Sequence, residues 1–354
     1  MASSPGASQA SSTSSGVRWG SRLWAQTASP AFFRRSAAVT VWALGAGIVS
    51  GGAVRLTGSG LGCTDWPTCT RTSVIAPLAY HAWVEFGNRL VEAVLTAGIV
   101  ALALAALRRR PRRGDLVALS LCLALGMFAE VVLGGEVVLH KLAPAWVMGH
   151  FWLSMGLLVA AVVLWHRGRL IDVPTGQRPG WASVQPARLL VKKYQLLGAR
   201  CMLGWTFVVV ALGTVVTGAA PDAGAPDVPR FHFLSLYRLA QLHGSSAEIL
   251  LALTVVTLWS LHRSGVDQAV FRRAEVVLVV LVCQAAVGYT QYLTAEPALL
   301  VGVHIAGATS LIVAMCWFNF GLFSREEPIL LPQTGNVRAE VGTTTELVAN
   351  IARR

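Results

Sequence analysis

The sequence predicts an all-α integral membrane protein, with eight transmembrane helices arranged as two pseudo-symmetric four-helix bundles. The first observation behind this is composition, because 54% of the 354 residues are hydrophobic and only 13% are charged. A soluble domain typically carries about 25% charged residues. The second is a series of apolar stretches of the ~20 residues that a bilayer crossing requires. The third is an internal repeat that divides these stretches into two sets of four.

The apolar stretches give the order of the predicted elements. They lie at 36–55, 82–107, 115–135, 146–165, 200–219, 241–261, 273–292 and 299–322. The start of the chain is rich in Ser, Ala and Gly and lacks an early apolar core, which favours a disordered tail. We therefore expect five regions in order. They are a cytoplasmic tail (1–35), an N-terminal bundle (36–165), a cytoplasmic linker (166–199), a C-terminal bundle (200–322) and a second cytoplasmic tail (323–354).

The net charge of +12 predicts an orientation in the membrane and not a nucleic-acid partner. Basic residues precede the first span, form RRRPRR at 108–113, follow the fourth span and lie between the sixth and seventh. Loops rich in Lys and Arg face the cytoplasm. We thus expect a multi-pass plasma-membrane protein with both termini in the cytoplasm, whose other loops, beginning with 56–81, face outward.

Two cysteines stand out in the first outward loop, which reads TGSGLGCTDWPTCT at 57–70. An outward compartment is oxidising, which favours a structural or redox-active disulfide between Cys63 and Cys69. Free thiols and a metal site are the alternatives. Two cysteines alone make a poor metal site, since structural zinc usually has four ligands.

The repeat aligns Asn88 of the second span with His243 of the sixth. His150 follows Asn88 by 62 residues, and His304 follows His243 by 61 residues. Each of these two histidines lies near the start of the last span of its half. In the third span of each half, an acid or amide also stands four residues before a glycine. These pairs are Glu130 with Gly134 and Gln284 with Gly288. Each half has four spans, so both share one orientation, as in a parallel repeat.

Ionisable groups inside a bilayer are costly and mark functional sites. His243 and His304 lie at similar depth on different helices of the second bundle. Facing side chains of a four-helix bundle commonly hold cofactors, and two imidazoles suit a six-coordinate haem iron. We predict a haem between them; the alternative is that they are hydrogen-bonded to the backbone or to each other.

The first bundle differs at the corresponding positions. His150 is present, but its partner is Asn88, whose carboxamide is a poor iron ligand. Glu85 and Arg89 are four residues apart, a spacing that favours an ion pair on a helix. Glu85 aligns with Ala240 in the second half. The first bundle is therefore expected to hold a reactive site whose haem keeps one face open to oxygen, and the second a closed electron-transfer site.

Five motifs resemble the haem A synthase family over roughly residues 36–320. They are GGAVRLTGSGLGCTDWPTC (51–69), EFGNR (85–89), GHFxxS (149–154), QLH (241–243) and VH (303–304). The resemblance implies a membrane haem-modifying oxidoreductase. Such an enzyme oxidises a methyl group of haem O to a formyl group by successive hydroxylations, and supplies haem A to cytochrome oxidase.

The resemblance also implies roles for individual residues. It implies haem b as the cofactor, with its iron between His243 and His304, and haem O as the substrate in the first bundle. It places the essential glutamate at Glu85 and one substrate-haem histidine at His150. Asn88 stands where the family has the other histidine, so this chain departs from the family there.

The family's outward cysteine pair maps onto Cys63 and Cys69, which implies a disulfide that shapes the lid of the substrate site or delivers electrons near it. We expect Glu85, paired with Arg89, to manage protons or to stabilise a cationic intermediate at the ring methyl. The haem sites are expected in the outer half of the membrane. The implied partners are the lipid bilayer, haem O synthase, cytochrome oxidase assembly factors and an unidentified electron donor, with no nucleic acid.

Two other classes of protein remain as alternatives. A haem-binding membrane cytochrome would pass electrons without modifying a haem, and product analysis separates it from a synthase. A transporter would use the repeat for alternating access and would bind no chromophore.

Overall fold

Eight long helices dominate the computed structural model, which describes residues 27–176, 178–220, 224–225 and 227–324. They are α2 (Pro30–Leu56), α3 (Tyr80–Arg108), α4 (Gly114–Leu139), α5 (Pro144–Gly168), α6 (Lys193–Ala219), α7 (Leu236–Arg263), α8 (Gln268–Leu293) and α9 (Ala298–Gly321). Each is long and apolar enough to cross a membrane. The predicted all-α membrane class is thus confirmed, and the chain is a multi-pass membrane protein.

The helices contain the predicted spans to within one residue, but most begin earlier than hydropathy indicates. α2 begins at Pro30, so its first turns occupy residues that the sequence analysis assigned to the disordered tail. Ser29 accepts a hydrogen bond from the Phe32 backbone N–H, and Pro30 fills the first helical position. This cap explains the earlier start. The rest of that predicted tail, 1–26, and residues 325–354 of the second tail lie outside the described residues.

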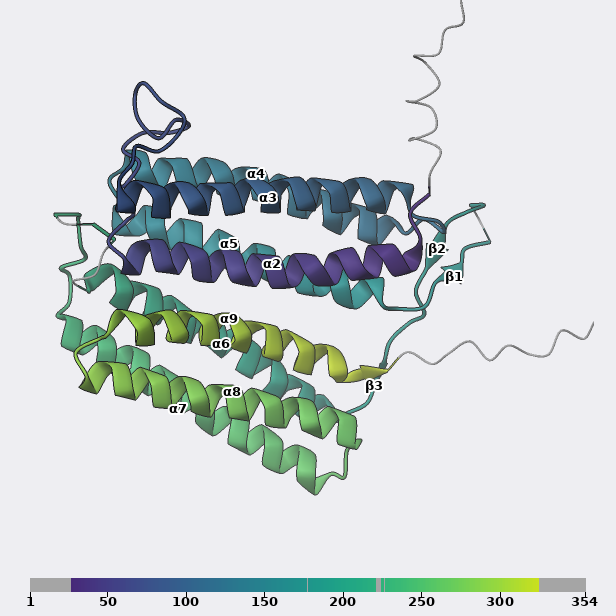
Figure 1. Ribbon diagram of the computed structural model, residues 1–354. Helices are drawn as coiled ribbons and strands as arrows, with labels where there is room; N and C mark the ends of the chain where they lie inside the picture. The colour runs from purple at the N-terminus through teal and green to yellow at the C-terminus, as the bar shows by residue number, and fades with distance from the viewer. Residues whose placement is uncertain (1–26, 177, 221–223, 226, 325–354) are drawn as a thin grey trace, which may run out of the picture.

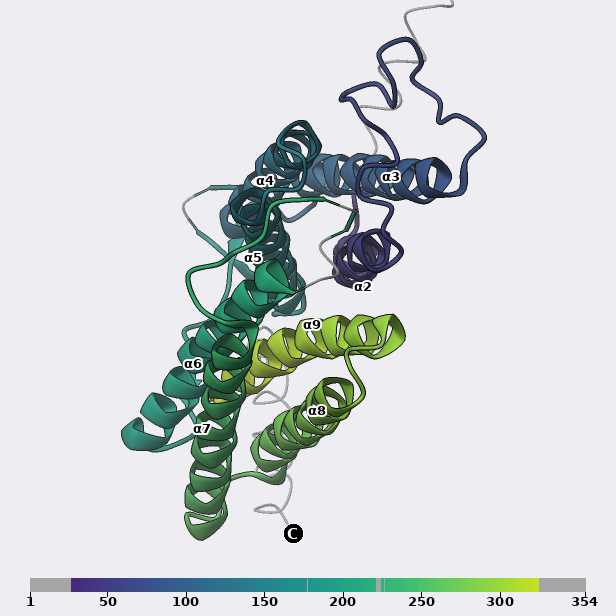
Figure 2. The same ribbon diagram turned by 90° about the vertical axis from the view of Figure 1, so that its left-hand side faces the viewer.

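The helices form two four-membered rings, which Figures 1 and 2 show from two sides. In the first ring α2 packs against α3 and α5, and α4 closes the ring between them. In the second, α6 packs against α7 and α9, and α8 closes it. The rings touch through α2 with α9, α5 with α6, and α5 with α9. If α2 and α6 exchange places, and α5 and α9 do the same, these three contacts between the rings are unchanged as a set. The two rings are therefore related by a pseudo-two-fold axis, and the predicted pseudo-symmetric pair of bundles is confirmed.

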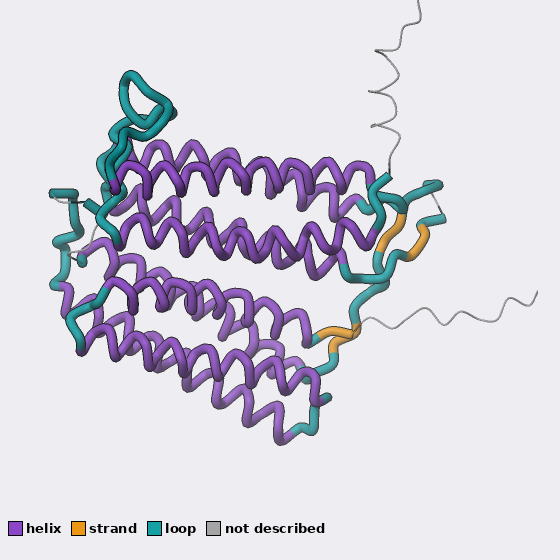
Figure 3. Tube along the Cα trace, in the orientation of Figure 1, coloured by secondary structure: helices purple, strands orange, loops and turns teal. Residues whose placement is uncertain are grey.

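The connections gather at two opposite ends of the helices (Figure 3). The disulfide loop 57–79 lies at one end. At the other end, the segment between α5 and α6 forms β1 (Val173–Pro174), which pairs antiparallel with β2 (Ala182–Ser183). Near α6, β3 (Arg188–Leu189) pairs antiparallel with β4 (Phe323–Ser324), the extension of α9. These short strands were not predicted.

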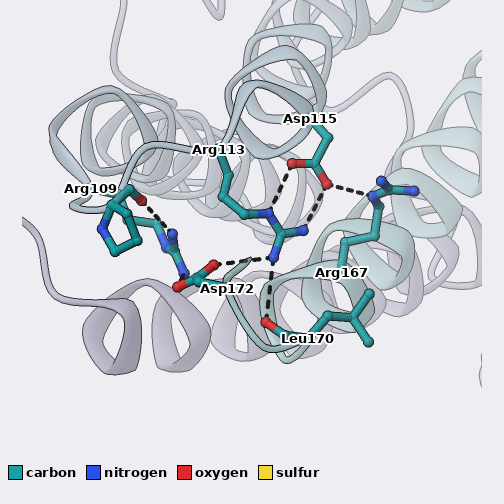
Figure 4. Close-up of polar contacts among 7 residues, drawn as sticks. Arg109, Arg113, Asp115, Arg167, Leu170 and Asp172 are labelled. Carbon is teal, nitrogen blue, oxygen red and sulfur yellow. Dashed lines mark hydrogen bonds and ion pairs between the residues drawn. The ribbon is translucent and has the colours of Figure 1, made fainter. Parts of the chain in front are cut away.

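An arginine network fixes the linker to the end of the first bundle opposite the disulfide loop (Figure 4). Arg113 is fully buried and donates two hydrogen bonds to Asp115, of 2.8 and 3.0 Å. Asp172 of the linker accepts from Arg109 at 2.7 Å and from Arg113 at 3.4 Å. Arg167 at the end of α5 donates to Asp115 at 2.7 Å. Removing either aspartate would take a carboxylate partner from the fully buried Arg113, which is destabilising, so part of RRRPRR is structural.

Candidate functional site

The disulfide predicted between Cys63 and Cys69 is present, and both residues are fully buried. The loop that carries it is seated on α3. The backbone N–H of Cys63 donates a 2.7 Å hydrogen bond to Glu85 Oε2. Glu85 is the sixth residue of α3, in its second turn, and is only 5% exposed. The cysteine loop and the predicted acid therefore form one unit.

Arg89 completes this unit. One of its nitrogens, Nη2, lies 2.8 Å from Glu85 Oε1, which confirms the predicted helical ion pair. Arg89 also donates to the backbone carbonyls of Asp65 at 3.0 Å and Thr68 at 3.1 Å. The planar guanidinium can reach all three acceptors at once, an arrangement that a lysine cannot reproduce. Sequence spacing indicated the ion pair but contained no signal for the two loop carbonyls.

Two glycines allow the loop to approach the helices closely. A Cβ atom at Gly62 would collide with the backbone carbonyl of His81 at the start of α3. A Cβ at Gly135 of α4 would collide with the indole of Trp66. Only glycine permits these contacts. The loop consequently covers the end of the first bundle above Glu85.

The second predicted residue of the first bundle, His150 of α5, lies beside an acid of α4. Its Nδ1 is 3.3 Å from Glu130 Oε1, which also accepts a hydrogen bond from the Ser154 hydroxyl. The His150–Glu130 contact has ion-pair distance without hydrogen-bond geometry. Among the described residues, Glu130 Oε2 and Glu92 Oε1 of α3 are buried without a hydrogen-bond partner. Buried polar atoms of this kind mark a functional site in a membrane protein.

In each half, the glycine that follows the acid or amide by four residues lies against a histidine, a contact that the sequence did not predict. A Cβ at Gly134 would lie 3.1 Å from His150 Cε1, and one at Gly288 would lie 3.2 Å from His304 Cε1. The two halves thus use the same close approach of helix backbone to imidazole. A side chain on either glycine would push the ring out of place.

Asn88 is held by a neighbouring helix. Its Oδ1 accepts a 2.8 Å hydrogen bond from the hydroxyl of Ser50 in α2. The carboxamide oxygen is therefore already engaged within the protein. This contact agrees with the view that Asn88 does not take the place of an iron-ligating histidine.

In the second bundle, His243 of α7 and His304 of α9 face each other, with ring centroids 6.1 Å apart and ring planes at 81°. Two metal–nitrogen bonds of about 2.1 Å plus the ~1 Å radius of each ring give about 6 Å, so the distance between the ring centroids matches the spacing that two imidazoles on one iron require. His243 Nδ1 lies 3.0 Å from the Val209 carbonyl, which can only accept, so this nitrogen carries the proton. Its Nε2 is then left free to bind metal.

The chain is similar to known proteins. A family described as cytochrome oxidase assembly protein matches residues 74–316. A relative named heme A synthase from Halalkalibacterium halodurans is 23% identical over 278 residues, covering 76% of this chain and 90% of that protein. One of the same name from Bradyrhizobium sp. is 25% identical over 370 positions, covering 86% and 97%.

A third relative of that name, from Geobacillus kaustophilus, is 34% identical over 134 residues. That match covers 36% of this chain and 40% of the relative. The match to the protein of the same name from Geobacillus thermodenitrificans is similarly partial, at 41% of the relative's length.

Proposed function

We propose that this chain, which belongs to the cytochrome oxidase assembly protein family, oxidises a methyl group of haem O to a formyl group and so forms haem A. The reaction would proceed by successive hydroxylations, as in a membrane oxidoreductase. The observation that carries the proposal is the unit of Glu85, Arg89 and the Cys63–Cys69 loop, built over the first bundle. The second bundle lacks it, because Ala240 stands where the first has Glu85.

The residues of the first bundle would divide the work. His150 would face the substrate haem, steadied by Glu130 beside its Nδ1. Glu85 would accept or release a proton near the ring methyl, since Arg89 and the Cys63 N–H fix the orientation of its carboxylate. Removing such an acid–base group typically costs a factor of about 10²–10⁴ in rate. The disulfide loop would exclude water from this end of the bundle.

The second bundle would hold haem b as the resident cofactor. His243 and His304 would bind its iron, and the Val209 carbonyl would fix the tautomer of His243. Held by these residues, haem b would supply electron-transfer chemistry: two electrons for each hydroxylation in the first bundle, in which dioxygen would be the oxidant and water the second product. The protein's contribution is to position the two haem sites in neighbouring bundles.

The same proposal assigns a role to each bundle, an orientation in the membrane and a set of partners. The N-terminal bundle (36–165) would be the substrate domain and the C-terminal bundle (200–322) the haem b domain. Both termini would lie in the cytoplasm, with the haem sites toward the outer half of the plasma membrane. Haem O synthase would deliver the substrate, cytochrome oxidase assembly factors would receive the product, and a separate donor would supply electrons.

The experiment that tests this role is Glu85→Gln, measured as conversion of haem O in membranes. Glutamine keeps the size and one acceptor oxygen but removes the charge and the base. We expect conversion to fall at least about a hundredfold while haem b stays bound. Glu136→Gln, at a partly exposed acid of α4 near the same end of the first bundle, is the matched control and should keep wild-type conversion. Normal conversion by Glu85→Gln would remove Glu85 from the mechanism.

A further inference from the structure

We propose that a quinol binds to α7 on the side that points away from the bundle. This quinol is the electron donor to the iron held by His243 and His304. This inference rests on the proposed haem b in the second bundle. It adds a binding site, the polar face of α7, defined as Arg238, Gln241, Ser245 and Glu248. The sequence motifs assign neither this face nor the electron donor.

The polar face follows one side of a helix that crosses the membrane. Its members are spaced by three, four and three residues, and all four are exposed on the surface of the bundle. Residues at this spacing lie on the same side of an α-helix. The lipid-facing side of a transmembrane helix is normally apolar, so four polar side chains here mark a candidate binding site.

The repeat supplies an internal comparison. The alignment that sets Asn88 against His243 also sets four residues of α3 against the polar face. They are Trp83, Phe86, Leu90 and Ala93. All four are apolar, although three of them are exposed like their counterparts. Polarity on this side is therefore peculiar to the second bundle and does not come from the general architecture.

A hollow lies on the polar face. It has a volume of about 400 Å³ and is lined by Leu234, Arg238, Gln241, Leu242 and Ser245. This volume falls within the ~300–1,000 Å³ usual for small-molecule sites. Two leucines supply apolar walls, and three side chains supply hydrogen-bonding groups. The combination suits a flat ring that carries hydroxyl groups.

Glu248 lies one turn further into the helix, toward the membrane interior. It accepts a 2.6 Å hydrogen bond from the hydroxyl of Tyr289 on α8, and both residues are exposed. A carboxylate that faces hydrocarbon is costly, and such residues mark functional sites. Beside a quinol it is a proton acceptor, and Tyr289 holds it in place. An anionic lipid headgroup would suit Arg238 but would be repelled by Glu248, whereas a neutral quinol suits both.

The position of His243 connects this site to the iron. Gln241 and Ser245 are two residues before and after His243, which places them on the opposite side of the helix. The width of one helix, about 10 Å, then separates the polar face from the imidazole. A quinol bound there would lose two electrons and the protons of its two hydroxyl groups, and become a quinone. Each electron would reduce one ferric iron to ferrous, in two successive steps, and the protons would leave through Glu248 to water at the membrane surface.

The test uses the full chain, purified with haem b bound, and a decyl-substituted benzoquinol as the reductant. Reduction is followed by the absorbance of ferrous haem after rapid mixing. We expect Glu248→Gln, which removes the proton acceptor, to slow reduction at least about tenfold. Ser245→Leu, which fills the hollow, should do the same. Dithionite should reduce both variants as fast as wild type, and Leu90→Ala on the matching face of α3 should have no effect.

A second measurement does not depend on haem. A photoreactive azidobenzoquinone should label residues 234–248 in wild type and in His243→Ala, and Ser245→Leu should abolish the labelling. Labelling without any bound haem b would support the quinol site and reject the proposed cofactor. Equal quinol reduction rates in wild type, Glu248→Gln and Ser245→Leu would overturn the proposal. Two other results would also overturn the proposal. One is displacement of the label by anionic lipid vesicles. The other is self-association of the protein that Glu248→Gln abolishes while the rate of haem reduction by quinol stays unchanged.

Discussion

Arg89 is the residue on which the seating of the disulfide loop depends most directly, so Arg89→Ala should release that loop. The Arg89 side chain is 18% exposed, and its guanidinium contacts three acceptors, namely the Glu85 carboxylate and the carbonyls of Asp65 and Thr68. After the substitution, Glu85 keeps the backbone N–H groups of Cys63 and Gly62 as partners. The loop then remains attached by these contacts and by its packing against the helices.

The size of the effect follows from the bonds lost. A hydrogen bond to a charged group contributes about 1.5–3 kcal/mol. The two carbonyl bonds of Arg89 therefore amount to at least about 3 kcal/mol, before the effect on the Glu85 charge is added. At 1.4 kcal/mol per factor of ten, the fraction of molecules with an open loop should rise at least about a hundredfold.

Access to the buried disulfide measures this opening. Membranes are treated with a water-soluble phosphine, the released thiols of Cys63 and Cys69 are alkylated, and the labelled peptide is quantified by mass spectrometry. Both sulfurs are buried in the closed loop, so reduction reports the open population. Arg71→Ala, at an exposed arginine of the same loop, is the control. A labelling rate for Arg89→Ala within about threefold of wild type would refute the reasoning.

Three further predictions follow from the haem sites. His304→Ala should remove the low-spin spectrum of a bis-histidine haem, because one of the two imidazoles that fit the iron is lost; an unchanged spectrum would exclude it as a ligand. Glu130→Gln should raise the midpoint potential of a haem held by His150, because the carboxyl group 3.3 Å from the imidazole Nδ1 is replaced by an amide that withdraws less of the ring proton's charge; spectroelectrochemistry of the haem O complex measures this, and an unshifted potential would contradict it. Asn88→His should create a second bis-histidine spectrum when haem O is bound, and its failure to appear would show that this position does not face the iron.

Much of the fold could be predicted from the sequence, because in a membrane chain hydropathy and helix length are linked by bilayer thickness. Glycines four residues after Glu130 and Gln284 showed the repeat, and the structure places both glycines against the histidines. Helix starts were predicted less well. The cap at Ser29 depends on a single hydrogen bond and leaves no trace in hydropathy.

The candidate site could be predicted only where its contacts are local. The Glu85–Arg89 pair was visible as a four-residue spacing along one helix. The bonds from this pair to the loop were not visible, because they involve backbone groups about twenty residues away whose placement depends on the path of the loop. The polar face of α7 was missed for another reason, since a polar residue between apolar ones gives no sign of whether it faces the bundle or the lipid.

The central claim is that this chain makes haem A, and analysis of its haems tests it most directly. The protein is produced together with a haem O-forming enzyme and purified in detergent, and its haems are extracted with acidified acetone and separated by chromatography. The account predicts haem b together with haem A or its hydroxylated precursor, and the precursor and product should vanish in Glu85→Gln. Haem b alone, with haem O unchanged in the membrane, would contradict the claim and identify the chain as a cytochrome that only passes electrons.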